Sequence, residues 1–229
     1  MKYFSQMTPE DCLAAVKENG WHLQRVPFEA RTRVLCLAAV KQDGWALKYV
    51  PKPLHDTEIC LEAVRSTGQA LKEVEESFKT PELCLAAVNE CGAALIYVPT
   101  ELKTIELCLV ALLQDACAIR YVPVDLVTSE LCLKVVLKDG WAARYIPHKY
   151  LTSEMCLLAV TQNGRILFGL PEDHINTEVC LAAVRQNGEA LDYVPFELKT
   201  PAVCLAAITQ NERAIRYSPY SILELMCKS

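Results

Sequence analysis

Apolar and polar positions recur along the chain with a fixed period of 24 residues. In the unit formed by residues 80–103, an apolar run from Leu83 to Val88 is followed by polar residues and by a second apolar run from Ala93 to Val98. A period of this length is typical of stacked helical repeats, in which no unit can bury its apolar faces without its neighbours. The sequence therefore predicts an all-α fold, an α-solenoid of about nine 24-residue helical-hairpin repeats with a curved or superhelical course.

Residues that start and stop helices recur at the same period. Thr80 is suited to cap the first helix, because its hydroxyl can accept an unpaired backbone N–H, and Pro81 fits the first helical position. We expect Gly92 to end this helix as a left-handed cap and Pro99 to end a second, shorter helix, which gives helices of roughly 11 and 7 residues. The capping slot holds Thr8, Thr32, Asp56, Thr80, Thr104, Thr128, Thr152, Asn176 and Thr200.

The repeats account for nearly all of the 229 residues. We expect one continuous domain over residues 1–229, with an N-terminal cap at 1–7, nine repeats at 8–219 and a C-terminal capping helix at 220–229. No run approaches the roughly 18–20 apolar residues of a membrane helix, and the N-terminus lacks the pattern of a secretion signal, so the expected location is the cytoplasm. The net charge of −5 disfavours a general nucleic-acid binder.

Nine of the twelve cysteines follow the 24-residue period. Equivalent positions of stacked helices lie about 8–10 Å apart, whereas a disulfide needs Cα atoms within about 6.8 Å. No CxxC or HxxH pair accompanies these cysteines, so we expect reduced, buried thiols with no metal and no cofactor. Cys91 and Cys117 lie off the period and are interpreted as surface thiols. The periodic cysteines are Cys12, Cys36, Cys60, Cys84, Cys108, Cys132, Cys156, Cys180 and Cys204.

The sequence offers little for catalysis. The four histidines, His22, His55, His148 and His174, occupy four different slots of the repeat, so we expect them not to converge on a metal ion or to act as a base. The chain contains neither a nucleophile elbow, nor a phosphate-binding loop, nor a dinucleotide fingerprint. We therefore predict a protein that is not an enzyme and that has no catalytic residues.

A ladder of aromatic and cationic residues on the second helix is the strongest functional signal. Tyrosine recurs in one slot, often after lysine or arginine, as in Arg120 and Tyr121. Aromatic residues beside arginine are typical of interface hot spots. Alternatively, each tyrosine ring packs between repeats with its hydroxyl in water. The candidate binding residues are Trp45, Lys48, Tyr49, Tyr97, Arg120, Tyr121, Trp141, Arg144, Tyr145, Arg165, Phe168, Tyr193, Arg216 and Tyr217.

Several repeats depart from the common pattern, and local rules tend to break where a protein functions. The third and seventh repeats are therefore candidates for the functional surface. The unusual residues are Glu73 and Glu75 in the third repeat, Arg165, Phe168 and Gly169 in the seventh, and Ala116 and Glu212, which replace the glycine of the fifth and ninth.

The string CLAAVKQDGWALKYVP, from Cys36 to Pro51, resembles the repeats of a bacterial family known as domain of unknown function 4116. The similarity covers nearly the whole chain and implies a repeat fold, but it implies no biochemical activity. Some members of the family resemble translocated effectors of intracellular bacteria. The 24-residue period is also similar to that of leucine-rich variant repeats, whose alternating helices match less well.

Three functions are compatible with these residues. We expect a protein-interaction scaffold that holds a protein or a peptide in a groove lined by the second helices. An alternative is single-stranded nucleic acid, with bases on the tyrosines and phosphates on Arg120, Arg144 and Arg216, although acidic residues such as Asp192 interrupt the stripe. A third function, implied by the resemblance, is an effector module that acts on a protein in the host cytosol.

Overall fold

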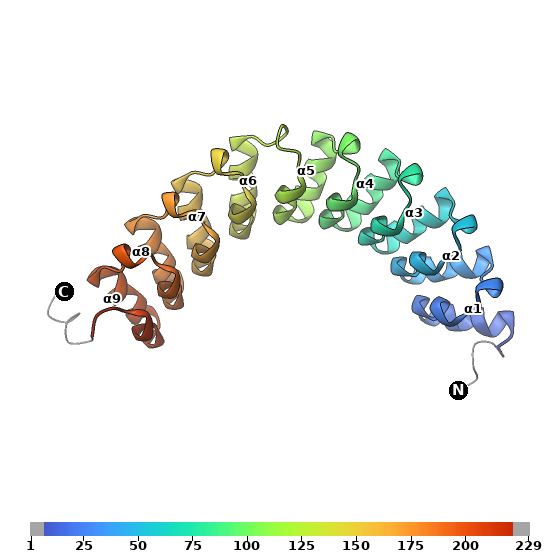
Figure 1. Ribbon diagram of the computed structural model, residues 1–229, viewed down its shortest axis with the longest axis horizontal. Helices are drawn as coiled ribbons and strands as arrows, with labels where there is room; N and C mark the ends of the chain where they lie inside the picture. Colours follow the sequence, from blue (N-terminus) through green and yellow to red (C-terminus); the bar gives the residue numbers. More distant parts are fainter. Residues whose placement is uncertain (1–6, 222–229) are drawn as a thin grey trace. The chain divides into compact units, whose positions relative to one another are not determined.

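Each repeat holds one α-helix followed by short 3-10 segments. The computed structural model describes residues 7–221, and this part of the chain contains no β-strand. The repeats group into two compact units, residues 1–123 and 124–229, and within each unit consecutive repeats lie side by side (Figure 1). The all-α repeat solenoid predicted from the period is therefore confirmed. Of the predicted terminal caps, only Met7, Tyr220 and Ser221 are described, and none of the three is helical.

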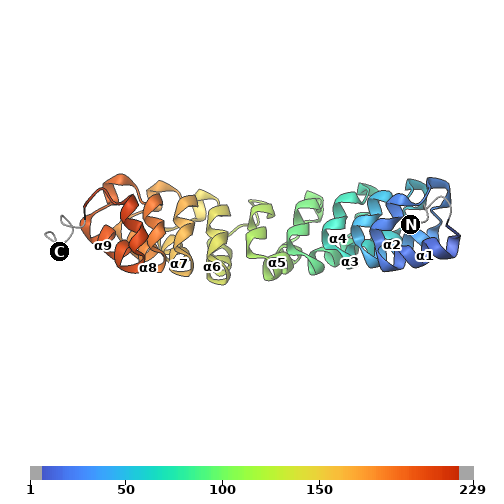
Figure 2. The ribbon, with the colours of Figure 1, turned by 90° about the horizontal axis from the view of Figure 1, so that it is seen from below.

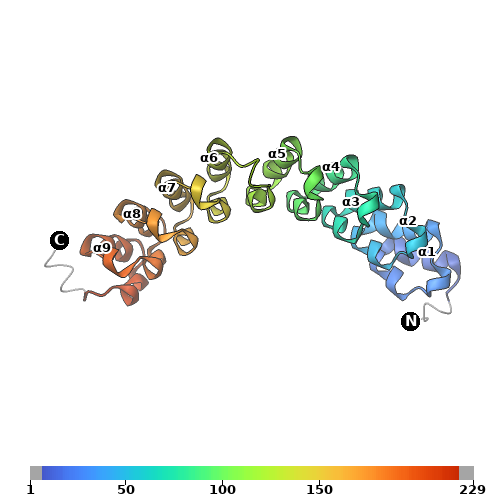
Figure 3. The ribbon, with the colours of Figure 1, turned by 45° about the horizontal axis from the view of Figure 1, so that its top comes forward.

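The α-helices of each unit pack against their neighbours in the sequence. Figure 2 shows α1 to α4 in succession in the first unit, and Figure 3 shows the same for α7, α8 and α9 in the second. No described helix is both long enough and apolar enough to cross a membrane. The first unit contains α1 (Pro9–Glu18), α2 (Arg33–Gln42), α3 (Thr57–Ser66), α4 (Pro81–Glu90) and α5 (Ile105–Gln114); the second contains α6 (Ser129–Lys138), α7 (Ser153–Gln162), α8 (Thr177–Gln186) and α9 (Pro201–Gln210).

The predicted N-terminal caps are confirmed at all nine α-helices of the described chain. At α4, the Leu83 amide donates a hydrogen bond to the Thr80 hydroxyl at 3.2 Å. At α1, the amide of the capping residue Thr8 also donates a hydrogen bond, to the carboxylate of Asp11. Because the side-chain oxygen takes up an N–H that has no partner inside the helix, the cap fixes where each helix begins.

The second segment of each repeat is a 3-10 helix of six residues, so the expected seven-residue helix is slightly too long. A segment this short favours the tighter pattern in which the N–H of one residue bonds to the carbonyl three residues earlier. The segments are η2 (Gly20–Arg25), η4 (Gly44–Tyr49), η6 (Gly68–Glu73), η8 (Gly92–Tyr97) and η10 (Ala116–Tyr121) in the first unit, and η11 (Gly140–Tyr145), η13 (Gly164–Gly169), η15 (Gly188–Tyr193) and η17 (Glu212–Tyr217) in the second.

In the described chain, seven repeats have a third segment, which the sequence analysis does not predict, directly after the slot that usually holds proline. It is a three-residue 3-10 turn that leads to the next capping residue. These segments are η3 (Phe28–Ala30), η5 (Lys52–Leu54), η7 (Glu76–Phe78) and η9 (Thr100–Leu102) in the first unit, and η12 (His148–Tyr150), η14 (Glu172–His174) and η16 (Phe196–Leu198) in the second.

The repeated glycine does not have the predicted left-handed conformation, because no glycine of the chain has a positive φ. It is the first residue of the second segment, and its role is to permit close approach. At Gly164, a Cβ atom would lie under 3.0 Å from the carbonyl oxygen of Ala183 in the next repeat, and real Cβ contacts are essentially never that short. The two repeats without this glycine, with Ala116 and Glu212, are the last of their units, so no following helix of the same unit needs the space.

The core consists of small and medium apolar side chains together with the periodic cysteines. All nine periodic cysteines are buried, and they are free thiols, as predicted. Burial raises the pKa of the Cys36, Cys60 and Cys84 thiols to about 11, because the thiolate would lose its hydration. These positions are therefore packing sites between helices.

Candidate binding surface

In the first unit, the predicted cationic and aromatic side chains meet on the second segments. The Lys48 ammonium lies 4.8 Å from the centre of the Tyr49 ring and 4.6 Å from that of Trp21, a residue that the sequence analysis did not select, and the two rings meet edge to face at 6.0 Å. The Arg120 guanidinium lies 4.6 Å from the centre of the Tyr121 ring. At such distances a cation is attracted to the ring face. The remaining predicted residues of this unit, Trp45 and Tyr97, are half-buried.

In the second unit, four of the predicted side chains from three consecutive repeats form one cluster. The Arg144 guanidinium lies 5.4 Å from the centre of the Trp141 ring and 5.7 Å from that of Phe168. The Phe168 and Tyr193 rings lie 5.1 Å apart at an angle of 55°. Phe168 is 66% exposed, which is unusual for a phenylalanine that also has aromatic neighbours. We call Trp141, Arg144, Phe168 and Tyr193 the aromatic–arginine cluster.

The irregular seventh repeat is what allows this cluster to form. Gly169 stands in the slot that holds tyrosine in most repeats, and a Cβ atom there would overlap the side chain of Arg144. The missing side chain therefore leaves room for Arg144 to reach Phe168. Arg165, the other unusual residue of this repeat, is exposed on η13.

The other candidate residues of the second unit lie outside the cluster. The Arg216 guanidinium lies 4.6 Å from the centre of the Tyr217 ring and also pairs with Glu189 of the preceding repeat at 3.5 Å. Tyr145 is half-buried on η11. The pairing with Glu189 offsets part of the positive charge that the sequence places on this stripe.

The tyrosines are also part of the packing between repeats, as the alternative interpretation proposes. Tyr49, Tyr97, Tyr121 and Tyr217 are half-buried. Their carbonyl oxygens accept hydrogen bonds from a cationic side chain of the repeat before: Arg31 at 2.7 Å, Lys79 at 3.0 Å, and Lys103 and Lys199 at 3.1 Å. The backbone at the tyrosine positions therefore links consecutive repeats, while the rings are only partly covered.

The third repeat shows no comparable cluster among its described residues. Glu75, in the proline slot, pairs with Lys52 of the preceding repeat at 3.1 Å, and Glu73 is half-buried in the tyrosine slot. An exposed ion pair of this kind contributes about 0–1 kcal/mol.

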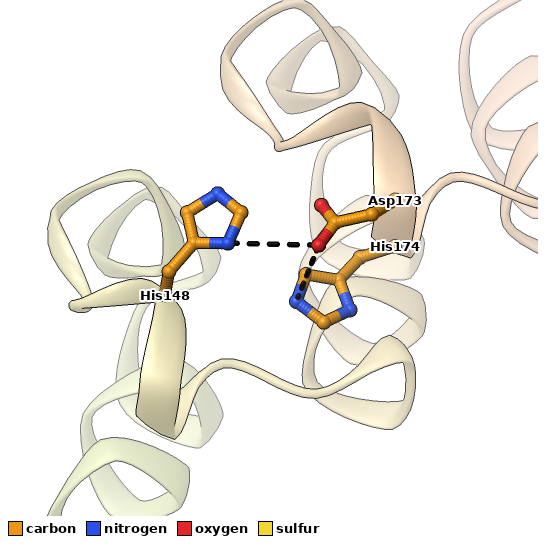
Figure 4. Close-up of side chains that lie close together, drawn as sticks. All are labelled: His148, Asp173 and His174. Atoms are coloured by element: carbon orange, nitrogen blue, oxygen red, sulfur yellow. Dashed lines mark ion pairs between the residues drawn. The ribbon is translucent and has the colours of Figure 1, made fainter.

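The expectation that the histidines lie apart is wrong for two of them. His148 and His174 lie in adjacent repeats with ring centres 5.7 Å apart, and the carboxylate of Asp173 lies between them (Figure 4). The sequence analysis compared slots within one repeat, whereas stacking brings each residue close to those about 24 to 26 positions further on. A search for polar pairs at that separation finds this group from the sequence.

The two cysteines off the period are partly accessible. Cys91 and Cys117 have intermediate burial, between that of the buried thiols and that of a surface residue. The Gln69 side-chain amide lies 3.8 Å from the Cys91 sulfur. The interpretation of Cys91 and Cys117 as surface thiols is therefore only partly correct.

Comparison with known proteins gives one family. The model described as domain of unknown function (DUF4116) matches five segments, which together span more than half of the chain. Neither the search of curated proteins nor the search of solved structures finds a match. The matched segments are residues 8–54, 35–79, 80–127, 152–199 and 176–223.

Proposed function

Because the chain belongs to the family described as domain of unknown function 4116, a description that states no activity, we propose its function from its surface. We propose that the protein is a non-enzymatic scaffold that binds another protein or a peptide along the second segments of its repeats. The observation that carries the proposal is the aromatic–arginine cluster, in which Phe168 is 66% exposed beside Arg144, Trp141 and Tyr193.

The composition of the cluster suits protein recognition. Tryptophan, tyrosine and arginine are the residues most enriched at interface hot spots, where a few side chains supply most of the binding energy. Covering an exposed phenylalanine side chain contributes about 1.5–3 kcal/mol. Arg144 can donate hydrogen bonds from its edge while its face lies over the two rings.

The scaffold holds these side chains at fixed spacing. The cluster lies on η11, η13 and η15, and each of these segments starts at a glycine amide that donates to a glutamine side chain of the next repeat. Because the segments are tied together in this way, a partner meets a preorganised surface and less entropy is lost on binding.

Charge supports a protein partner over a nucleic acid. A general nucleic-acid binder has a basic excess, whereas this chain has a net charge of −5 and Arg216 is paired with Glu189. The free state of the eleven described cysteines supports a reducing compartment, so we propose the cytosol. An effector module acting in a host cytosol would use the same surface.

The test is affinity capture with the full chain and two variants. Phe168→Ala combined with Arg144→Ala removes the centre of the cluster. Phe196→Ala is the matched control, because Phe196 is a similarly exposed phenylalanine, at 74%, on the third segment of the neighbouring repeat. We expect a set of proteins captured by the wild type and by Phe196→Ala to be lost with the double variant.

Two results would contradict the proposal. The first is capture that is unchanged in the double variant while circular dichroism shows that it is folded. The second is tight binding of a single-stranded oligonucleotide that weakens steeply between 50 and 200 mM salt, which would indicate phosphate contacts.

A further inference from the structure

Three side chains of the second unit bring metal-binding atoms together at the junction of two repeats. His148 is the first residue of η12, and Asp173 and His174 are the last two of η14, the equivalent segment of the next repeat. The distance from the Asp173 Oδ2 atom to the His148 Nδ1 atom is 3.6 Å, and that to the His174 Nε2 atom is 4.0 Å (Figure 4). All three potential ligand atoms lie within 4.8 Å of one another.

Hydrogen bonds to other described residues do not hold these three side chains. The structure shows no hydrogen bond from any of them to another described residue, and the two separations above are longer than a hydrogen bond. The side chains of His148 and Asp173 are 63% exposed and that of His174 is 19% exposed. An ion from solvent can therefore reach the group, while His174 is held in place by its surroundings.

His174 also departs from the pattern of the repeat. The same slot holds an apolar side chain in most other repeats: Leu54, Phe78, Leu102, Leu126 and Leu198. A half-buried imidazole contributes less to packing there than leucine does. His174 therefore replaces an apolar side chain and lies beside two other groups that can bind a metal ion. This combination favours a ligand site over a role in packing.

We propose that His148, Asp173 and His174 bind one divalent transition-metal ion, with Zn²⁺ the best match. Zn²⁺ binds imidazole nitrogen and carboxylate oxygen at about 2.0–2.2 Å, which places tetrahedral ligand atoms about 3.3–3.6 Å apart. The two separations from Asp173, 3.6 and 4.0 Å, are close to these values, and rotation of the exposed His148 and Asp173 side chains can bring all three ligand atoms to one ion. Two imidazoles and one carboxylate are a poor set for Ca²⁺ or Mg²⁺, which take oxygen ligands. Water fills the fourth position, and the bound ion links η12 to η14.

The described thiols of the second unit do not compete for this ion. The described cysteines of this unit, Cys132, Cys156, Cys180 and Cys204, are all buried, so an ion from solvent does not reach them. The more accessible described thiols, Cys91 and Cys117, lie in the first unit. Co²⁺ separates the two kinds of site, because cobalt bound to thiolate gives an intense charge-transfer absorption that cobalt bound to imidazole and carboxylate lacks.

The experiment titrates the full chain with Zn²⁺ by calorimetry and with Co²⁺ by absorption, in chelator-stripped buffer at pH 7.5. We expect one site per chain without the thiolate absorption. His174→Leu, which restores the residue typical of the slot, and Asp173→Asn should each weaken the affinity at least about tenfold. The matched control is His22→Gln, since His22 lies in the first unit with its ring bonded to the Ala15 carbonyl.

The thermal midpoint supplies a second readout. Added Zn²⁺ should raise the midpoint of the wild type and of His22→Gln, because a ligand that binds only the folded state stabilises it, and it should raise that of His174→Leu clearly less at the same concentration. Equal affinity in the wild type and His174→Leu would overturn the proposal, as would a Co²⁺ complex that shows thiolate absorption alone. Failure of the partner-capture test would not affect this result.

Discussion

At the scale of the residue, the repeated glycine sets how closely two repeats approach. Its missing Cβ matters because the carbonyl of an alanine in the next repeat lies where that atom would be. The same reasoning separates the glycines into two kinds. Gly164 faces backbone, which cannot move aside, whereas Gly169 faces only the flexible side chain of Arg144.

This difference predicts the stability of two alanine variants. Gly164→Ala should lower the free energy of unfolding by about 1–3 kcal/mol, as overpacking does in a close-packed interior. Gly169→Ala should change it by under about 1 kcal/mol, because Arg144 can rotate away. Urea denaturation measures both. Equal effects would mean that close approach is not the reason for the glycine.

The periodic cysteines give a second prediction at this scale. Burial raises the pKa of Cys60 from an ordinary value of 9.0 to about 11, so the folded state holds the proton more tightly than the unfolded state. The contribution of the protonated Cys60 thiol to the free energy of unfolding is fully present below pH 9 and is lost as the pH rises towards 11. The wild type should therefore lose stability over this range, and Cys60→Ala should lose less, as measured by urea midpoints.

Labelling tests the same burial at neutral pH. At pH 8, a thiol reagent followed by mass spectrometry should modify Cys91 and Cys117 well before Cys60 or Cys84, which are fully buried. Labelling of the buried thiols at the rate of Cys91 would contradict the packing described here.

At the scale of the element, a glutamine at the end of the α-helix joins neighbouring repeats. The Gln186 Oε1 atom accepts a hydrogen bond from the Gly164 amide at 2.6 Å, and the Gln186 Nε2 atom donates one to the Gln162 carbonyl at 3.3 Å. Gln162 and Gln210 bond in the same way to Gly140 and Gly188. The second segment of one repeat and the α-helix of the next are thus held in register.

Removal of this side chain tests its contribution. Gln186→Ala leaves the amide of the buried Gly164 without its acceptor, so we expect a loss of about 1–3 kcal/mol in the free energy of unfolding. Gln186→Glu keeps the acceptor and should lose less. The exposed neighbouring variant Arg185→Ala is the control, with a change within about 0.5 kcal/mol. An equal loss of unfolding free energy in all three variants would show that the hydrogen bond from Gly164 to Gln186 does not stabilise the fold.

At the scale of the whole molecule, the period alone predicts the architecture. The capping residues, the buried cysteines and the alternation of a longer with a shorter helix all follow from positions that recur every 24 residues, whereas the third segment does not. The sequence does not predict the 3-10 geometry, because the difference between 3-10 and α winding over six residues depends on packing. Nor does it indicate the real role of the glycine, since the neighbour that requires it belongs to another repeat.

The candidate sites, too, could be predicted from the sequence only in part. The aromatic and cationic residue types were predicted, but their grouping around Phe168 depends on the space beside Gly169, which only the packed structure reveals. The histidine group was missed for a related reason. His148 and His174 differ in slot, and only stacking brings their rings to 5.7 Å.

The most direct test of the central claim is the dissociation constant of a captured partner for the wild type, Phe168→Ala and Phe196→Ala, measured by calorimetry. If the aromatic–arginine cluster is the binding surface, Phe168→Ala should weaken binding by roughly thirtyfold or more, the effect of a hot spot worth about 2 kcal/mol. Phe196→Ala should change it less than about threefold. A Phe168→Ala variant that is folded and binds as tightly as the wild type would contradict the account.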